Sequence, residues 1–233
     1  MNHLSQQQAG QLNIAIDGPA GAGKSTVAQQ VARVLGYIYI DTGAMYRAVA
    51  LHMLRKNIMP DQEEAVLEQI PHILVTLEPG EDRQRVLLNG EDVTDSIRTS
   101  EVSMYASRFA QLPAVREHLV HMQRQLAANK GVVMDGRDIG THVLPDAEMK
   151  WFLTATVEER ARRRYAEANG SESITLEQLM HDIAERDKQD ETRAISPLRQ
   201  AQDAKLLDTT DLTVEQIVDH LVNQAKLRMD GEL

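Results

Sequence analysis

The first part of the chain alternates short apolar runs with amphipathic stretches. Leu12–Asp17 (LNIAID) is a continuous apolar run that predicts a buried strand, and a glycine-rich turn follows it. The next pattern predicts a helix from Lys24 that ends at Gly36. Tyr37–Asp41 (YIYID) predicts a second strand, and the helix after it begins with Thr42 as its expected N-cap. This strand–helix–strand–helix order predicts a mainly parallel α/β sheet.

The alternation changes between about residues 60 and 99. His72–Gly80 and Arg83–Thr94 alternate apolar and polar positions in the manner of strands, and Asn89-Gly90 is a typical hairpin turn. A small antiparallel insert is therefore expected here. It could be a plain surface hairpin or a flap on the substrate side of the protein, and the sequence alone leaves both interpretations open.

Helices and strands resume their alternation in the second half. Val132–Asp135 and Glu148–Ala155 predict further strands of the parallel sheet. The other predicted elements are helices at Glu101–Ala110, Pro113–Asn129, Thr156–Asn169 and Thr175–Glu191, a strand within Ala204–Thr210, and a last helix at Thr213–Met229 with Thr213 as its cap.

Composition excludes several classes of function. Hydrophobic residues make up 42% of the 233 positions, which indicates a folded chain, and the net charge of −10 argues against a nucleic-acid-binding protein. No cysteine is present, so disulfides and thiolate zinc sites are excluded. No apolar run is long enough for a membrane span, and the polar residues 1–11 are not a secretory signal. We expect a disordered lead over residues 1–11 and a cytoplasmic monomer.

The glycine-rich turn carries the most specific motif of the chain. The residues GPAGAGKST match the pattern G-x-x-x-x-G-K-[ST], and they lie between a predicted strand and a predicted helix. Glycines let the backbone N–H groups point at phosphate oxygens, at the positive end of the following helix. The lysine of such a loop reaches the β- and γ-phosphates of ATP, and its serine can ligate Mg²⁺. The predicted ATP-binding residues are Gly18, Pro19, Ala20, Gly21, Ala22, Gly23, Lys24, Ser25 and Thr26, with Ser25 as the metal ligand.

Motor, switch and kinase functions all use such a loop, and the distribution of arginines helps to choose among them. Transfer of a phosphoryl group needs positioning and neutralisation of charge more than covalent chemistry, and arginine forks suit both tasks. Arg160, Arg163 and Arg164 share one face of a predicted helix. Each arginine taken alone is better explained as a solvated or ion-paired surface charge. Together with Arg47, Arg116, Arg137, Arg186 and Arg193 they favour a kinase.

A second charged cluster follows the strand Val132–Met134. Asp135, Arg137 and Asp138 fall within four residues around a glycine, at the end of the strand. Asp135 could orient the arginines, engage the water shell of Mg²⁺, or simply cap the strand end. Asp138 could bind a ligand or form an ion pair with Arg137 or Arg116.

Seven motifs together resemble one family. IAIDGPAGAGKST, IDTGAMYRA, PAVREHL, DGRDIGT, ERARRR, ERDKQDETRAISPL and LDTT occur in the order typical of bacterial cytidylate kinases, from Leu12 to the last helix. The resemblance implies a P-loop NTPase three-layer α/β fold with a mainly parallel central sheet. Its core would span residues 12–59 and 100–233, with a helical lid at about 157–195 and an inserted NMP-binding subdomain at 60–99. It also implies phosphorylation of CMP and dCMP by ATP with Mg²⁺.

The family's binding positions fall on particular residues of this chain. The cytosine contacts would be Thr42, Ser107, Arg116 and Asp138. The contacts to the acceptor phosphate and ribose would be Tyr46, Arg47, Arg137, Arg186, Asp190 and Arg193, with Asp135 beside them. The catalytic residues would be Lys24, Arg137, Arg163, Arg186 and Arg193, and Arg160 and Arg164 would join the ATP contacts.

The resemblance also suggests how the charged cluster chooses its substrate. We infer that Asp138 accepts a hydrogen bond from the cytosine 4-amino group, whereas the acceptor oxygen of uracil would be repelled. This chain has Thr42 where the family often has serine, which keeps the hydroxyl. Lys188, Gln189 and Glu191 stand where relatives can carry more arginine.

Two other functions fit parts of the sequence. A P-loop kinase of the shikimate type also holds an anionic acceptor with arginines, but Asp138 and Ser107 suit a base better than a carboxylated ring. A nucleotide-binding switch would need a water-positioning residue and switch segments, and the sequence shows neither.

Overall fold

The computed structural model describes residues 11–80, 83–167 and 175–232. Within it the chain forms two compact units. The first unit comprises residues 1–39 and 129–233, and the second comprises residues 40–128. The insert predicted at 60–99 thus lies within a larger unit that also contains the helices on either side of it. The lead predicted for residues 1–11 falls, up to residue 10, outside the described residues.

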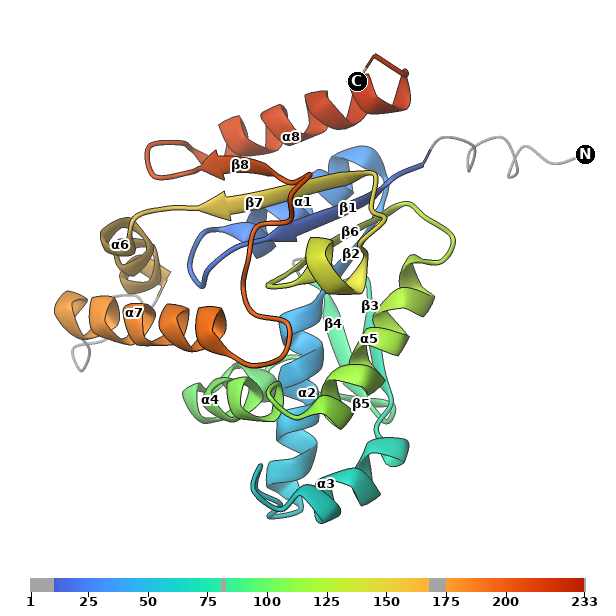
Figure 1. Cartoon of the computed structure of the whole chain (residues 1–233), viewed down its shortest axis with the longest axis vertical. Helices are drawn as coiled ribbons and strands as arrows, with labels where there is room; N and C mark the ends of the chain where they lie inside the picture. Colours follow the sequence, from blue (N-terminus) through green and yellow to red (C-terminus); the bar gives the residue numbers. More distant parts are fainter. Residues whose placement is uncertain (1–10, 81–82, 168–174, 233) are drawn as a thin grey trace, which may run out of the picture. The chain divides into compact units, whose positions relative to one another are not determined.

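A five-stranded sheet with the order β2-β6-β1-β7-β8 organises the first unit (Figure 1). β1 pairs in parallel with β6 and β7, and β7 pairs in parallel with β8. The central strands β1 and β6 are buried along their whole length, as expected of parallel strands covered on both faces. The strands are β1 (Asn13–Asp17), β2 (Ile38–Asp41), β6 (Val132–Gly136), β7 (Met149–Thr154) and β8 (Lys205–Asp208).

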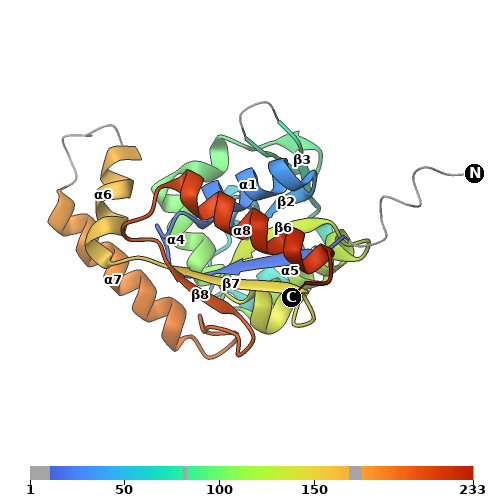
Figure 2. The same cartoon turned by 90° about the horizontal axis from the view of Figure 1, so that it is seen from above.

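Helices α1 (Lys24–Leu35) and α8 (Val214–Met229) pack together over the sheet, as the view from above shows (Figure 2). Their apolar faces meet side chains of β1 and β7 in one core, in which Ile14, Trp151 and Leu221 are almost fully buried. This core fixes the end of β1 against the start of α1, where the predicted phosphate loop lies.

Two further helices and one tight turn complete the first unit. Helix α6 (Val157–Glu167) packs against α7 (Leu176–Thr192). A π-helical turn (Ile139–Val143) follows β6 directly. The sequence pattern did not predict this turn, because one wide turn leaves no periodic signal.

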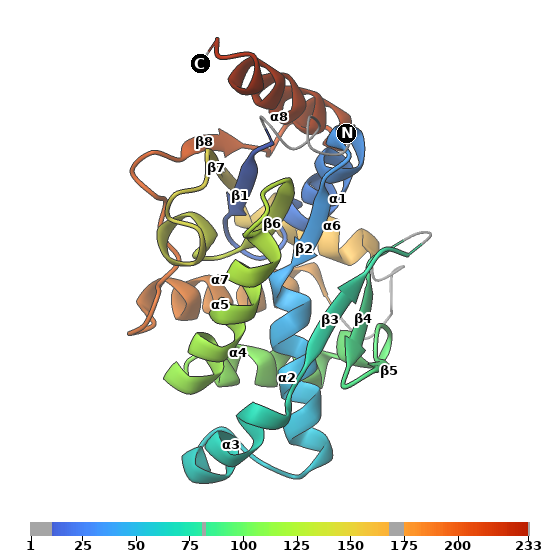
Figure 3. The same cartoon turned by 90° about the vertical axis from the view of Figure 1, so that its right-hand side faces the viewer.

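The second unit is built around α2 (Thr42–Arg55), which packs against α4, α5 and a small antiparallel sheet (Figure 3). That sheet has the order β3-β4-β5 and contains the predicted Asn-Gly turn. The remaining elements are β3 (Val75–Glu78), β4 (Arg85–Leu88), β5 (Glu91–Asp92), α3 (Glu63–Gln69), α4 (Ser100–Phe109), α5 (Pro113–Ala127) and two 3-10 turns at Ile70–His72 and Ser96–Arg98.

The predicted α/β class, parallel sheet and antiparallel insert are confirmed. One predicted cap is wrong. Asp41, not Thr42, caps α2, because its carboxylate accepts the N–H of Ala44 at 2.8 Å and Thr42 is already the first helical residue. Among the described residues, no helix is both long and apolar enough to cross a membrane.

Candidate functional site

Residues 18–23, the predicted phosphate loop, join β1 to α1, and the glycines of this loop have backbone angles that other residues rarely adopt. Gly18, Gly21 and Gly23 have φ of 145°, 78° and 80°. A Cβ on Gly18 would overlap the carbonyl oxygen of Leu153, and one on Gly21 would lie 3.1 Å from Cβ of Arg160. Glycine is therefore required here by backbone conformation and by close packing. The loop ends at the N-terminus of a twelve-residue helix, where backbone N–H groups and the helix dipole favour an anion.

Lys24, the first residue of α1, is almost completely buried beside this loop. Its ammonium donates a hydrogen bond to the carbonyl of Pro19 at 2.7 Å. Burial and, to a smaller extent, the charge of Arg137 together lower its pKa to about 7, although Asp135 and Asp17 act in the opposite direction. Negative charge from a bound polyphosphate would raise this pKa, so the site favours anionic ligands.

Asp135 lies at the end of β6, with its carboxylate between two hydroxyl groups. The hydroxyl of Ser25, the second residue of α1, donates to Oδ2 at 2.8 Å. The hydroxyl of Tyr39 on β2 donates to Oδ1 at 2.9 Å. The structure therefore brings the predicted metal ligand next to the first carboxylate of the charged cluster. Hydroxyl and carboxylate oxygens are the ligands that Mg²⁺ prefers, together with phosphate oxygens and water.

Asp17, the last residue of β1, ties the phosphate loop to the turn after β6. Its carboxylate accepts the backbone N–H groups of Ile139 and Gly140 at 2.8 and 2.7 Å. Burial and, to a smaller extent, the nearby charge of Asp138 raise its pKa to about 6, although the two N–H groups oppose this rise. The backbone on the C-terminal side of Asp138 is thus fixed by the residue that precedes Gly18.

Arginines of the first unit gather around Asp190 on α7. Nε of Arg137 donates to its carboxylate at 2.8 Å, and Arg193 lies 3.9 Å from the other oxygen. Burial of Asp190 opposes its ionisation, but the charges of Arg137, Arg193 and Arg186 outweigh burial and hold its pKa below the usual value. Because Arg137 and Arg186 also act on the pKa of Lys24, four predicted site cations lie close together in this unit.

Arg160 joins α6 to the phosphate loop. Its guanidinium donates to the carbonyls of Ala155 at 2.9 Å and Ala20 at 3.0 Å, and it forms an ion pair with Asp187 at 2.6 Å. The side chain is almost fully buried. These contacts hold α6 and α7 against the loop, and the predicted contact between Arg160 and ATP stays a prediction.

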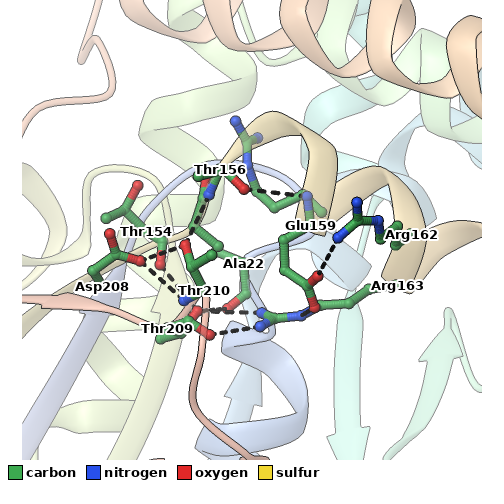
Figure 4. A network of polar contacts seen from close by, with 11 residues as sticks. Ala22, Thr154, Thr156, Glu159, Arg162, Arg163, Asp208, Thr209 and Thr210 are labelled. Carbon is green, nitrogen blue, oxygen red and sulfur yellow. Dashed lines mark hydrogen bonds and ion pairs between the residues drawn. The ribbon is translucent and has the colours of Figure 1, made fainter.

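Arg163 is held by the segment that follows β8 (Figure 4). Its guanidinium donates to the hydroxyl and the carbonyl of Thr209 at 3.2 and 2.6 Å, and to Glu159 at 3.0 Å. The hydroxyl of Thr209 lies 2.9 Å from the carbonyl of Thr154 and 3.5 Å from that of Ala22 in the phosphate loop. Arg163 therefore reaches the surroundings of the loop through Thr209.

The other predicted substrate residues lie in the second unit. Thr42 and Tyr46 are one turn apart on α2, and the guanidinium of Arg116 on α5 lies 5.8 Å from the centre of the Tyr46 ring. Arg47 donates to Asp41 at 3.1 Å, so the cap of α2 also orients this arginine. Ser107 lies on α4, which packs against α2.

Several residues with a part in this geometry were not predicted from the sequence. Asp17, Tyr39 and Thr209 contact the phosphate loop or residues beside it, and Asp187 pairs with Arg160. A polar residue at the end of an otherwise apolar strand was an available signal for Asp17. The pattern of apolar and polar positions gave no such signal for Tyr39, since a tyrosine suits a half-buried strand position without any further role.

In chemical terms the residues of the first unit are suited to a polyphosphate and a metal ion. It combines a helix N-terminus, a buried lysine, a paired hydroxyl and carboxylate, and clustered guanidinium groups. The described residues contain no group of three or more His, Cys, Asp or Glu side chains suited to hold a metal. Mg²⁺ does not require one when nucleotide phosphates and water complete its shell.

Comparison with known proteins agrees with these features. A family model described as cytidylate kinase matches residues 14–227. The chain is 54% identical over 213 residues to the cytidylate kinase of Desulfitobacterium hafniense (strain Y51), with 91% of each chain covered. It is 52% identical over 212 residues to that of Caldicellulosiruptor bescii, covering 91% of this chain and 94% of the relative.

A solved structure shows the same fold at much lower identity. It is an uncharacterized protein from Eubacterium ventriosum ATCC 27560, with a TM-score of 0.51 and 12% identity. The match covers 93% of this chain and 99% of the other.

Proposed function

Because the chain belongs to the cytidylate kinase family of phosphotransferases, we propose that it transfers the γ-phosphoryl group of ATP to CMP and dCMP. The products are ADP and CDP or dCDP. The observation that carries the proposal is the contact between Ser25 and Asp135, 110 residues apart, because it joins the phosphate loop to the DGRDIGT motif of the family.

The phosphate loop binds the donor. Its backbone N–H groups and the N-terminus of α1 receive the β- and γ-phosphates of ATP, and Lys24 pairs with their charge. Ser25 ligates Mg²⁺ and Asp135 contacts the same ion or its water shell. When bound, Mg²⁺ neutralises charge on the phosphates. Arg160 and Arg164 complete the ATP contacts.

Arginines promote the transfer itself. An oxygen of the CMP phosphate forms a bond to the γ-phosphorus of ATP while the bond from that phosphorus to the β,γ-bridging oxygen breaks. Arg137, Arg186 and Arg193 hold the acceptor phosphate and stabilise the charge that spreads over the transferred group, and Arg163 acts from α6. Asp190 supports them, because it already fixes the orientation of Arg137.

The acceptor is recognised through its base. Asp138 accepts a hydrogen bond from the 4-amino group of cytosine. Further contacts to the base come from Thr42, Ser107 and Arg116. Tyr46 and Arg47 join the contacts to ribose and phosphate, and Asp190 contributes to them. The insert at residues 60–99 serves as the acceptor-binding subdomain, and residues 157–195 serve as the lid.

The test is a coupled assay of ADP formation from ATP and Mg²⁺ with CMP, dCMP, UMP, AMP and shikimate offered separately. We expect fast turnover with CMP and dCMP and slow turnover with the other three. Fast turnover with shikimate alone would replace the proposal by the other kinase class. Slow ATP hydrolysis that no acceptor stimulates would indicate a nucleotide switch instead.

A further inference from the structure

Two hydroxyl groups donate to Asp135 from different directions, and only one of these two donors has a role in the proposed chemistry. Ser25 donates to Oδ2, and Tyr39 donates to Oδ1. The serine is the first candidate for a metal ligand. The tyrosine comes from β2, the strand next to β6 in the sheet.

The position of Tyr39 makes it a rigid partner. Its ring packs against the core beneath α1 and α8, while its hydroxyl reaches the carboxylate at 2.9 Å. A tyrosine side chain has only two rotatable bonds, so a packed ring fixes the position of its hydroxyl. The carboxylate of Asp135 is itself almost fully buried. Tyr39 therefore restrains the rotation of a buried carboxylate from the core side.

This restraint has a consequence for Ser25. A serine hydroxyl has one proton and two lone pairs. When the proton is donated to Oδ2 of Asp135, the lone pairs point away from the carboxylate and are available to a cation. Tyr39 occupies Oδ1 and so keeps Oδ2 directed at Ser25. Partners that orient the groups around a metal commonly affect metal affinity by about 10- to 100-fold.

We propose that Tyr39 is a positioning residue for Mg²⁺, acting through Asp135 on the orientation of the Ser25 hydroxyl. The inference rests on the proposed use of MgATP at the phosphate loop. It assigns no contact between Tyr39 and the nucleotide. Its effect should therefore be confined to the metal-dependent part of ATP binding.

The chain offers a matched pair of variants for the test. Tyr39→Phe removes only the hydroxyl that donates to Asp135. Tyr37→Phe removes a hydroxyl two residues earlier, which accepts the N–H of Leu12 at 3.0 Å and lies 3.3 Å from the sulfur of Met229, away from Asp135. Both changes leave an aromatic ring in place, so any general loss of packing should be similar in the two.

The measurement is ATP binding by calorimetry without CMP, in excess Mg²⁺ and again in excess EDTA. For Tyr39→Phe we expect the Mg²⁺-dependent gain in ATP affinity to fall by about 10-fold, with affinity in EDTA unchanged. For Tyr37→Phe we expect both affinities to match the wild type. Titration of Mg²⁺ at a fixed ATP concentration should separate the two variants in the same way. The half-saturating Mg²⁺ concentration should be higher for Tyr39→Phe than for Tyr37→Phe.

The outcomes separate this inference from the proposed function. If wild-type protein gains no ATP affinity from Mg²⁺, this inference fails, while the proposed function is decided separately by the coupled assay of ADP formation with CMP. If the wild type responds to Mg²⁺ and Tyr39→Phe responds equally, only the role of Tyr39 is overturned. Equal loss of affinity with and without Mg²⁺, or loss of folding in Tyr39→Phe, also overturns it, because the effect is then not specific to the metal.

Discussion

At the scale of single residues, Asp17 is the clearest case in which position sets chemistry. It is buried at the end of β1, accepts two backbone N–H groups, and has its pKa raised by burial to about 6 from an ordinary 3.8. Burial outweighs the two hydrogen bonds. Near neutral pH the residue is therefore a buried anion that fixes the backbone after Asp138.

The raised pKa of Asp17 makes folding stability depend on pH. The native state binds this proton more tightly than the unfolded state, so the stabilising contribution is present below about 3.8 and is lost as pH rises through about 6. The test compares the unfolding free energy of the wild type with that of Asp17→Asn. We expect the difference, wild type minus variant, to fall by roughly 1 kcal/mol between pH 5 and 6.5. Urea unfolding of both proteins across this range measures it.

The pH range of this experiment ends below about 7, because the pKa of Lys24 is lowered to about 7 and its titration would also change the stability. Asp203→Asn is the control, since hydrogen bonding to Lys150 lowers the pKa of Asp203 and it stays ionised throughout. A difference for Asp17→Asn that is flat, or that grows with pH, would contradict a raised pKa at this residue.

The sequence predicted some of these residues and missed others, and the difference has a physical reason. The loop residues from Gly18 to Thr26 could be identified because phosphate binding imposes a fixed spacing on glycine, lysine and serine. Tyr39 could not, because its partner Asp135 is 96 residues away in the sequence. Asp17 offered one signal, its polar side chain at the end of an apolar strand, but its partner Ile139 is 122 residues away. Only the parallel pairing of the strands brings these groups together.

At the scale of elements, α8 depends on a well-formed N-terminal cap. The hydroxyl of Thr213 accepts the N–H of Gln216 at 3.2 Å, and the Gln216 side chain accepts the N–H of Thr213 at 3.0 Å. This reciprocal capping box begins the helix whose apolar face closes the core over α1.

Thr213→Ala should lower the free energy of unfolding by about 1 kcal/mol, because it leaves an N–H group at the helix start without its partner. Urea denaturation provides the measurement. Thr213→Ser keeps the hydroxyl and should retain most of the wild-type stability. Equal stability of the alanine and serine variants would show that the cap contributes little, and ATP affinity should not change in either.

Most elements were predictable because their periodicity and end signals agree. Gly36 ends α1 with φ of 68°, and Thr213 caps α8, both as the sequence indicates. The cap of α2 was misassigned because Asp41 and Thr42 are adjacent and both are good capping residues. The π-helical turn after β6 and the seven-residue α3 were missed, since each is too short for a periodic pattern.

At the scale of the whole molecule, an acidic protein is proposed to bind two anionic nucleotides. The net charge is −10, so cations must be concentrated locally, and the described arginines around Asp190 and Lys24 show such a concentration in the first unit. The motifs IAIDGPAGAGKST and DGRDIGT were informative because the fold brings Ser25 of one next to Asp135 of the other. The contacts of the acceptor base stay predictions, since they depend on a bound ligand.

The proposed phosphorylation of CMP depends on recognition of the cytosine base by Asp138. The most direct test is the ratio of kcat/KM for CMP to that for UMP, measured with saturating MgATP on wild type and Asp138→Ala. We predict that the wild type favours CMP by about 100-fold or more, and that the variant loses most of this preference through reduced activity on CMP. An unchanged ratio in Asp138→Ala, or equal activity of the wild type on CMP and UMP, would contradict the account.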